Sequence, residues 1–400
     1  MHKNLFPSLI FIFLLSLGCS SDDDPTTPSL PTYEYLEDYT MVQEVSETSL
    51  ENLYRLVLGE DAPSVTWEKI VMYRVAYQTE DFSGEQVTAS GLLLLPANRS
   101  ASFPLISYQH GTLLNDNQAP SVANLFNNET AIGSLLAGHG FGVAMPDYLG
   151  YQRSRDIPHP YEEQSTLGQT SYDMLQASVE LIESLEASTT NDLFLVGYSE
   201  GGYATMALHR KIETENAFSV SHSYPGAGAY NKTAFSQAVL ERNEELPFMT
   251  TYLWVLYTYN NLYPQLQRPW NQIVQAPYVS LFENFDPLSL SLADLAQIPQ
   301  NPQELFLASF IEGIVNGTDT AFMEVLAAND NFDWEATAPI SLYHGSADGY
   351  VWPLNSSTAF EAMTERGNDV NYYSLEGLNH STAVGPYITA VLSAIQSELE

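Results

Sequence analysis

Short apolar segments alternate with segments of helical periodicity along most of this chain. The apolar segments are rich in Val, Ile, Leu, Phe and Tyr, which favour β-strands, and turn residues separate them from the helical segments. This alternation predicts an α/β fold, with a mostly parallel sheet of eight strands flanked by helices on both faces. Strands are expected at residues 69–77, 86–95, 104–108, 142–145, 193–196, 218–221, 340–343 and 370–375, and helices at residues 130–137, 167–185 and 382–399.

One long segment interrupts the alternation. Between residues 221 and 340, more than a hundred residues continue neither the strand pattern nor its spacing, and they are rich in Tyr, Trp and Phe. We expect this segment to form a mainly helical cap, inserted at about residues 228–336. Most of its aromatic rings are expected to form the core of the cap, and a minority to line a substrate cleft.

The segment at residues 193–202 combines an apolar strand with the sequence Gly-Tyr-Ser-Glu-Gly-Gly and a helix-compatible run. A serine on such a tight strand-to-helix turn has a strained backbone, and only small residues two before and two after it let neighbouring segments approach. The following helix points its positive end at the serine, which favours an oxyanion there. This context indicates that Ser199 is a catalytic nucleophile.

A serine hydroxyl needs a base to take its proton, and the base needs an acid to orient it. His380 lies in the loop after the last expected strand, and this makes it the best placed of the eight histidines. Asp348 follows the preceding strand after a glycine-containing turn, where a carboxylate could fix the imidazole tautomer. Asp319, Asp330 and Asp333 are rival acids, but they lie in the cap segment and follow no expected strand.

Two backbone N–H groups are expected to stabilise the oxyanion. One belongs to Glu200, directly after the serine, and the other to Thr112, because Gly111 lets the backbone approach the substrate closely. His110 is expected to hold that loop. An alternative role for the Glu200 side chain is that of a packing or salt-bridge residue, since a carboxylate beside the nucleophile would otherwise oppose oxyanion formation. No histidine–carboxylate spacing matches a zinc site, so we predict no metal.

The N-terminus has the features of a lipoprotein leader. The apolar run at residues 9–17 follows Lys3 and is typical of a signal peptide, because it is too short to span a membrane. It ends in Leu-Gly-Cys, which resembles a bacterial lipobox, although Leu17 stands where a small residue is usual. Cys19 is the only cysteine, so neither an intrachain disulfide nor a cysteine metal site can form.

These features predict a leader at residues 1–18, acylation of Cys19, a flexible tether at residues 19–32 and one domain at residues 33–400. The acidic residues after Cys19 resemble the export signal of lipoproteins that some bacteria display on the outer cell surface. We therefore expect the chain to be anchored to the bacterial outer membrane and exposed on its surface. The alternative is a plain secretory signal with an incidental cysteine.

Acidic residues dominate the charge of the chain. There are 49 Asp and Glu residues against 13 Lys and Arg, which gives a formal net charge of −36. Such a surface repels nucleic acids and anionic membranes, so neither is expected as a partner and membrane contact is expected only through Cys19.

Five motifs together resemble the α/β-hydrolase superfamily: YQHGT, PDYLGY, GYSEGG, HGSAD and GLNH. Within it, the chain most resembles the secretory-lipase-like branch of esterases and lipases, over about residues 65–400. The resemblance implies hydrolysis of carboxylic esters through an acyl-serine intermediate, without a cofactor, on a small-molecule or lipid ester. The chain order Ser199, Asp348, His380 is also the order of that fold.

Two other functions are compatible with these motifs. A serine peptidase of the same fold would use the same three residues to cleave short peptides, but no repeat that could gate such an enzyme is visible in the sequence. A surface binding protein could retain the fold without the chemistry. The presence of all three catalytic residue types argues against it.

Overall fold

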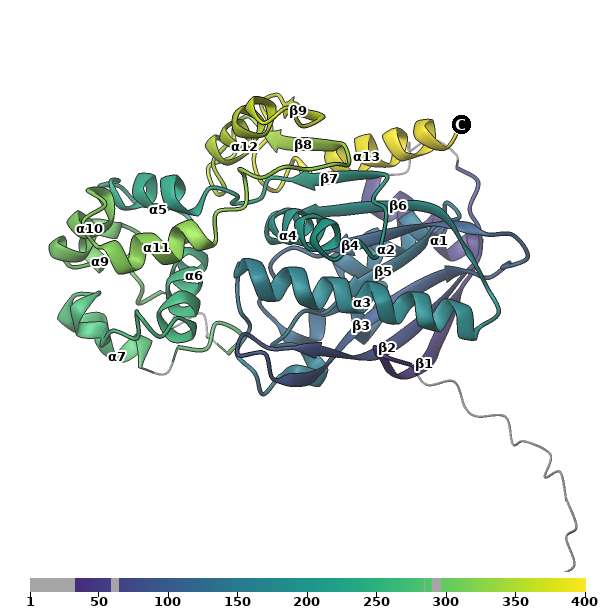
Figure 1. Ribbon diagram of the computed structural model, residues 1–400, viewed down its shortest axis with the longest axis horizontal. Coiled ribbons are helices and arrows are strands. Elements are labelled where there is room, and N and C mark those ends of the chain that lie inside the picture. The colour runs from purple at the N-terminus through teal and green to yellow at the C-terminus, as the bar shows by residue number, and fades with distance from the viewer. Residues whose placement is uncertain (1–32, 59–64, 284, 290–295) are drawn as a thin grey trace, which may run out of the picture. The chain divides into compact units, whose positions relative to one another are not determined.

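The apolar segments of the sequence form the strands of one sheet. The structure, a computed structural model, describes residues 33–58, 65–283, 285–289 and 296–400. In this part of the chain nine strands pair in the order β1-β2-β3-β5-β4-β6-β7-β8-β9 (Figure 1). Their bounds are β1 (Leu36–Val45), β2 (Ile70–Glu80), β3 (Gln86–Pro96), β4 (Phe103–Gln109), β5 (Gly142–Pro146), β6 (Thr189–Tyr198), β7 (His222–Gly226), β8 (Ile340–Gly345) and β9 (Val370–Leu375).

Strand direction divides the sheet into two parts. Strands β5, β4, β6, β7, β8 and β9 pair parallel to one another. Strands β1, β2 and β3 pair antiparallel, and β3 joins β5 in the same way. Because parallel strands bring their carboxyl ends to one edge, the loops that follow β4, β6, β8 and β9 lie at the same edge of the sheet.

Two strand predictions are corrected by the structure. The sheet has nine strands in the described residues where eight were predicted, because β1 was missed. Strand β1 pairs with β2 alone, and most of its side chains are exposed, so it lacks the alternation of a half-buried strand. The strand expected at residues 218–221 lies instead at His222–Gly226, whose last two residues, Pro225 and Gly226, are of types that are more common in turns.

Helices cover both faces of the sheet, as the alternation predicted (Figure 1). Val71, Tyr73 and Val75 of β2 pack in one hydrophobic cluster with residues of α3 and α4, whereas Ile70 and Met72 pack with residues of α1, α2 and α13. Alternate side chains of a strand point to opposite faces, so β2 is buried on both sides. The helices are α1 (Glu47–Leu58), α2 (Asn128–Ala137), α3 (Gln164–Ser184), α4 (Glu200–Glu215), α12 (Leu354–Glu365) and α13 (Val384–Leu399), with short 3-10 helices at Asp116–Gln118, Pro120–Val122 and Gln152–Ser154.

The segment between β7 and β8 is helical and forms its own hydrophobic cluster. We call these helices the cap; they lie together beside the carboxyl edge of the sheet (Figure 1). Two tyrosines of the cap donate hydrogen bonds to loops of the rest of the fold: Tyr259 Oη to Glu162 O at 2.8 Å, and Tyr252 Oη to Tyr350 O at 2.6 Å. The cap contains α5 (Lys232–Leu240), α6 (Met249–Leu262), α7 (Val279–Phe282), α9 (Pro302–Leu305), α10 (Ala308–Val315) and α11 (Thr320–Ala328), with 3-10 helices at Trp270–Gln272 and Ala276–Tyr278.

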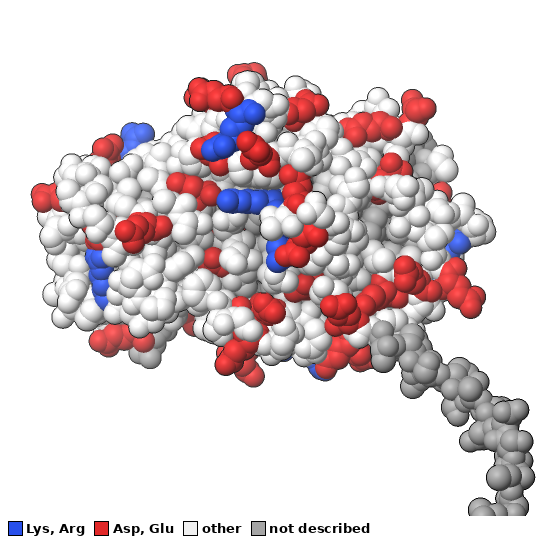
Figure 2. Space-filling model, viewed as in Figure 1, with Lys and Arg blue, Asp and Glu red and all other residues white. Residues whose placement is uncertain are grey.

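The predicted leader at residues 1–18, Cys19 and the tether at residues 19–32 lie outside the described residues. Among the residues that are described, no helix is both long and apolar enough to cross a membrane. Acidic side chains are spread over the face of the molecule in Figure 2 and outnumber the basic ones there, in keeping with the net charge of −36.

Candidate active site

Ser199 lies on the sharp turn between β6 and α4. Its backbone has φ 62° and ψ −125°, a conformation that L-residues rarely adopt, and its N–H donates to Gly226 O at 2.9 Å. A Cβ atom on Gly201 would lie 2.1 Å from Gln109 O, and one on Gly202 would lie 2.1 Å from Gly226 O. The two glycines after Ser199 therefore let the neighbouring strands β4 and β7 approach the turn.

His380 connects Ser199 to Asp348 through its two ring nitrogens. The Nε2 atom of His380 lies 2.8 Å from Ser199 Oγ, and its Nδ1 atom lies 2.6 Å from Asp348 Oδ2. His380 comes from the loop after β9, and Asp348 from the loop after β8. Tyr198 Oη donates to His380 O at 2.9 Å, which fixes the histidine loop against the turn. With Nδ1 protonated toward the carboxylate, Nε2 can accept the proton of the serine hydroxyl.

The Asp348 carboxylate is buried and fully hydrogen-bonded. Its Oδ1 atom accepts the backbone N–H groups of Tyr350 at 2.8 Å and Val351 at 3.0 Å. Burial alone would raise the pKa of Asp348, but hydrogen bonds from His344 and His380 outweigh burial and lower it to about 2. Asp348 is therefore ionised throughout the neutral range.

His344 was not assigned a role from the sequence. Its Nε2 atom lies 3.4 Å from Asp348 Oδ2 and 2.7 Å from Val351 O, and its Nδ1 atom lies 2.7 Å from Ser356 Oγ. The side chain thus orients the loop that carries Asp348. Its position in a strand, four residues before Asp348, is the feature of the sequence that could have indicated this role.

The segments that carry the two predicted oxyanion donors both lie next to Ser199. Glu200 is the first residue of α4, so its N–H has no acceptor within the helix. A Cβ atom on Gly111 would lie 3.3 Å from Tyr198 O and 3.9 Å from Ser199 Cβ, which places the loop with Thr112 against the turn. The ring of His110 lies 2.7 Å from Gly111 O and 3.2 Å from Asp147 O, in the loop-holding position that was expected.

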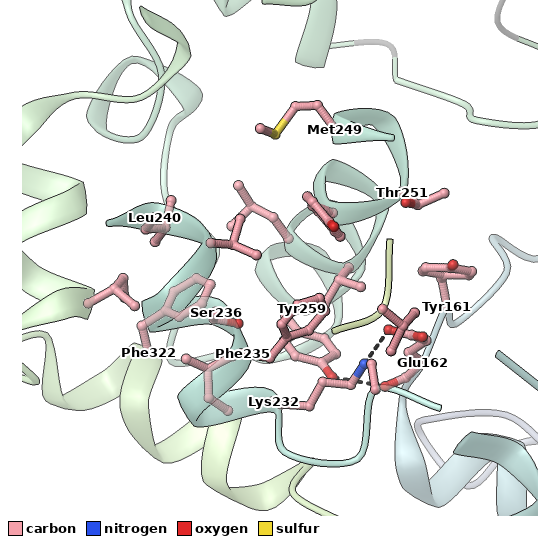
Figure 3. Close-up of a pocket in the computed structure, with 18 of the residues that line it drawn as sticks. Tyr161, Glu162, Lys232, Phe235, Ser236, Leu240, Met249, Thr251, Tyr259 and Phe322 are labelled. Atoms are coloured by element: carbon pink, nitrogen blue, oxygen red, sulfur yellow. Dashed lines mark hydrogen bonds and ion pairs between the residues drawn. The ribbon is translucent and has the colours of Figure 1, made fainter. Parts of the chain in front are cut away.

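Two clefts meet at Ser199. One is an apolar pocket of about 80 Å³ beneath the cap (Figure 3), and the other is an open groove of about 1000 Å³ between α2 and α13. Gly111, Thr112 and His380 line the groove. Apolar side chains of the cap line the pocket, among them Phe235, Val239, Leu240, Met249, Leu256 and Tyr259.

A buried ion pair lies in the wall of the apolar pocket. Lys232 of α5 and Glu162 point toward each other (Figure 3), and their side chains are only 3% and 7% exposed. Burial raises the pKa of Glu162 and lowers that of Lys232, and the attraction between the two groups opposes both shifts. Glu162 also has a positive φ of 51°. This pair could not be predicted from the sequence, because its members are 70 residues apart.

No metal site accompanies these residues in the part of the chain that the structure describes: no group of three or more His, Cys, Asp or Glu side chains there could hold an ion.

The family is decided by comparison with known sequences. A model of the secretory lipase family matches residues 120–396, a span that contains Ser199, Asp348 and His380. The chain belongs to the secretory lipase family. It is therefore a carboxylic ester hydrolase, and the predicted resemblance is confirmed. None of the curated proteins matches this secretory lipase.

Solved structures share the fold of this secretory lipase. A hydrolase described as putative from Legionella pneumophila is 25% identical, with a TM-score of 0.83, over 91% of this chain and 98% of that one. The rice cell wall degrading esterase LipA from Xanthomonas oryzae is 22% identical, with a TM-score of 0.77, over 91% and 97%. Candida antarctica lipase A is 15% identical, with a TM-score of 0.63, over 86% and 77%. The predicted α/β-hydrolase fold is thereby confirmed.

Proposed function

We propose that this secretory lipase hydrolyses esters through an acyl-serine intermediate on Ser199. The observation that carries the proposal is the unbroken chain of hydrogen bonds from Ser199 through His380 to Asp348. Ser199 Oγ attacks the ester carbonyl carbon while His380 Nε2 takes the hydroxyl proton. The backbone N–H groups of Glu200 and Thr112 stabilise the oxyanion.

The reaction is completed in two further steps. His380 gives its proton to the leaving alkoxide, so the alcohol departs and the acyl group stays on Ser199. A water molecule then gives a proton to His380 and attacks the acyl carbon, and the returning proton releases Ser199 and the carboxylic acid. Asp348 remains ionised throughout and stabilises the imidazolium that forms in each step.

The two clefts suggest where the acyl and alcohol parts of the ester bind. The alcohol is the first product and must leave while the acyl group is still attached, and water must then enter. Both events suit the open groove lined by Thr112 and His380. The narrow pocket beneath the cap is lined mainly by apolar side chains, which suits an apolar acyl group. The names of the structural neighbours, an esterase and a lipase, are consistent with an ester substrate.

Hydrolysis of p-nitrophenyl esters with acyl chains from C2 to C16 tests this function. We expect turnover with an optimum set by the cap pocket, and a loss of about 10³-fold or more in Ser199→Ala, because the three residues act as a unit. Folded protein that hydrolyses none of the esters, or a Ser199→Ala variant with full activity, would overturn the proposal.

We also propose that Cys19 is acylated after removal of residues 1–18, and that residues 19–32 tether the enzyme to the outer membrane with the domain at the cell surface. The lipobox-like sequence and the acidic residues after Cys19 support this. Cys19→Ala should release the protein from the membrane fraction and leave esterase activity intact. A protein that stays in the membrane fraction after this substitution would contradict the anchor.

A further inference from the structure

Glu200, the residue directly after the nucleophile, pairs with a buried histidine. His159 Nε2 is 2.7 Å from Glu200 Oε1, and the two side chains are 1% and 0% exposed. The other ring nitrogen of His159, Nδ1, lies 2.6 Å from Leu149 O. Glu200 Oε2 is buried without a hydrogen-bond partner among the residues that the structure describes. Within them, the Glu200 carboxyl group thus depends on His159 for its hydrogen bond.

The geometry of this pair fixes its charge. Leu149 O can only accept, so His159 Nδ1 must carry a proton. The 2.7 Å hydrogen bond between Nε2 and Glu200 Oε1 needs a second proton. If that proton is on Nε2, the pair is an imidazolium beside a carboxylate; if it is on Oε1, both groups are neutral. Both arrangements hold the same number of protons and no net charge. The Glu200 side chain therefore adds no net negative charge beside the site where the oxyanion forms.

Aromatic rings enclose the imidazole of His159. Tyr151 and Trp254 have ring centroids 4.9 Å and 5.4 Å from it, and those of Tyr148 and Tyr161 are 6.0 Å and 5.9 Å away. Aromatic rings exclude water and can stabilise a cation through their π-systems. Trp254 belongs to α6 of the cap, so the pair lies where the nucleophile turn meets the cap.

The same pair connects the two sides of the predicted oxyanion hole. Glu200 carries the first donor. Leu149, which accepts from His159, lies between two tyrosines that hold the loop of the second donor: Tyr148 Oη donates to His110 O at 3.1 Å, and Tyr151 Oη donates to Leu113 O at 2.8 Å. Thr112 lies between these two carbonyl groups in the chain. The hydrogen bonds of His159 thus link both donor-bearing segments.

We propose that His159 is a positioning residue for the ester hydrolysis: it pairs with Glu200, cancels the charge of that carboxylate beside the developing oxyanion, and links the two donor segments. This inference rests on the proposed function. An unpaired carboxylate in a site shielded from water would raise the energy of the oxyanion by direct repulsion. The effect belongs to the transition state, so it falls on kcat more than on KM.

The test compares four variants of the full chain with the wild type. His159→Gln leaves Glu200 without its proton-bearing partner, Glu200→Gln removes the charge, and the double variant combines both changes. His209→Gln is the matched control, because His209 is also fully buried and also contacts a glutamate, with Nε2 3.1 Å from Glu213 Oε1 on the far part of α4. His159→Asn replaces His159→Gln should the latter not fold, as judged by circular dichroism.

We expect His159→Gln to lower kcat on p-nitrophenyl esters by about 10- to 100-fold, with KM little changed. His209→Gln, which lies outside the site, should keep kcat near that of the wild type, and Glu200→Gln is the reference against which the double variant is compared. The double variant should recover most of the loss, because the charge that His159 cancels is then absent. A purely structural role for His159 would give no such recovery.

Two results would overturn the inference while the enzyme remains active: a kcat for His159→Gln equal to that of the wild type, or a double variant as slow as His159→Gln. A wild type that hydrolyses no ester would instead overturn the proposed function, and the role of His159 with it. Esterase activity of the wild type therefore separates the two failures.

Discussion

The hydroxyl of Ser199 combines a strained backbone with a neighbouring base. Its strained backbone projects it from the turn, and His380 lies within hydrogen-bonding distance. Ser199, His380 and Asp348 could be predicted because each follows a strand, and chain order then constrains which partners meet. His159, by contrast, contacts Glu200 across 41 residues and through a segment without a strand signal. Only the folded chain reveals that contact.

Asp348→Asn tests the acid at this scale. Because Asp348 holds the Nδ1 proton of His380, an amide in its place would favour the wrong tautomer of the imidazole. We expect kcat to fall by about 10³- to 10⁴-fold with KM little changed. Asp333→Asn is the control, since Asp333 is exposed and pairs with Arg366. Equal losses in the two variants, measured by ester hydrolysis, would argue against the role of Asp348.

The pair of Lys232 and Glu162 should matter for stability. Lys232→Met leaves the buried Glu162 carboxylate without its cation, so we expect the free energy of unfolding to fall by about 3–5 kcal/mol. Replacing both residues, in Lys232→Met with Glu162→Gln, removes both charges and should cost only about 1–2 kcal/mol. Urea unfolding monitored by fluorescence gives these values. A single variant no less stable than the double variant would contradict this interpretation.

Among the helices and strands, those with buried side chains were the ones that could be predicted from the sequence. Strands buried on both faces gave clear apolar segments, whereas the edge strand β1 has eight of its ten side chains exposed or half-buried and was missed. The helix α3 was predicted from Leu175, Val179 and Ile182 at helical spacing. The pattern did not reveal that α3 also buries an ionisable group, Asp173.

Asp173 should make stability depend on pH. Burial raises the pKa of Asp173 to about 6 from the ordinary value of 3.8. The folded state therefore binds a proton more tightly than the unfolded state, and stability falls as the pH rises from about 4 through 6. The loss at pH 7 is up to about 3 kcal/mol. Asp173→Asn should be more stable than the wild type at pH 7 by up to that amount and equal to it at pH 4.

Urea unfolding of both proteins at the two pH values measures this difference. The same pH dependence in wild type and Asp173→Asn would show that Asp173 is not its source.

At the scale of the whole molecule, charge sets the conditions under which the fold is stable. With a net charge of −36, the acidic side chains repel one another. Those spread over the surface in Figure 2 are exposed to solvent, so salt can screen this repulsion. The parallel sheet, the helices on both faces and the cap could all be predicted from the alternation and its interruption. The arrangement of the cap side chains around the pocket could not be predicted. The cap is helical, so it has no strand ends that would show which of its aromatic residues lie close together.

Salt should therefore stabilise this protein. Raising NaCl from 0.05 M to 1 M at neutral pH is expected to increase the melting temperature by roughly 2–5 °C, since the Debye length falls to about 3 Å. Differential scanning calorimetry measures the shift. A melting temperature that stays constant or falls would mean that self-repulsion does not limit stability.

The central claim is that Ser199 becomes acylated, and trapping the serine tests it most directly. A fluorophosphonate transfers its phosphonyl group to an activated serine oxygen and releases fluoride. We predict one adduct per chain, located by peptide mass spectrometry on Ser199, absent from Ser199→Ala and formed far more slowly in His380→Ala. An adduct on another residue, or none in folded protein that hydrolyses esters, would contradict the account.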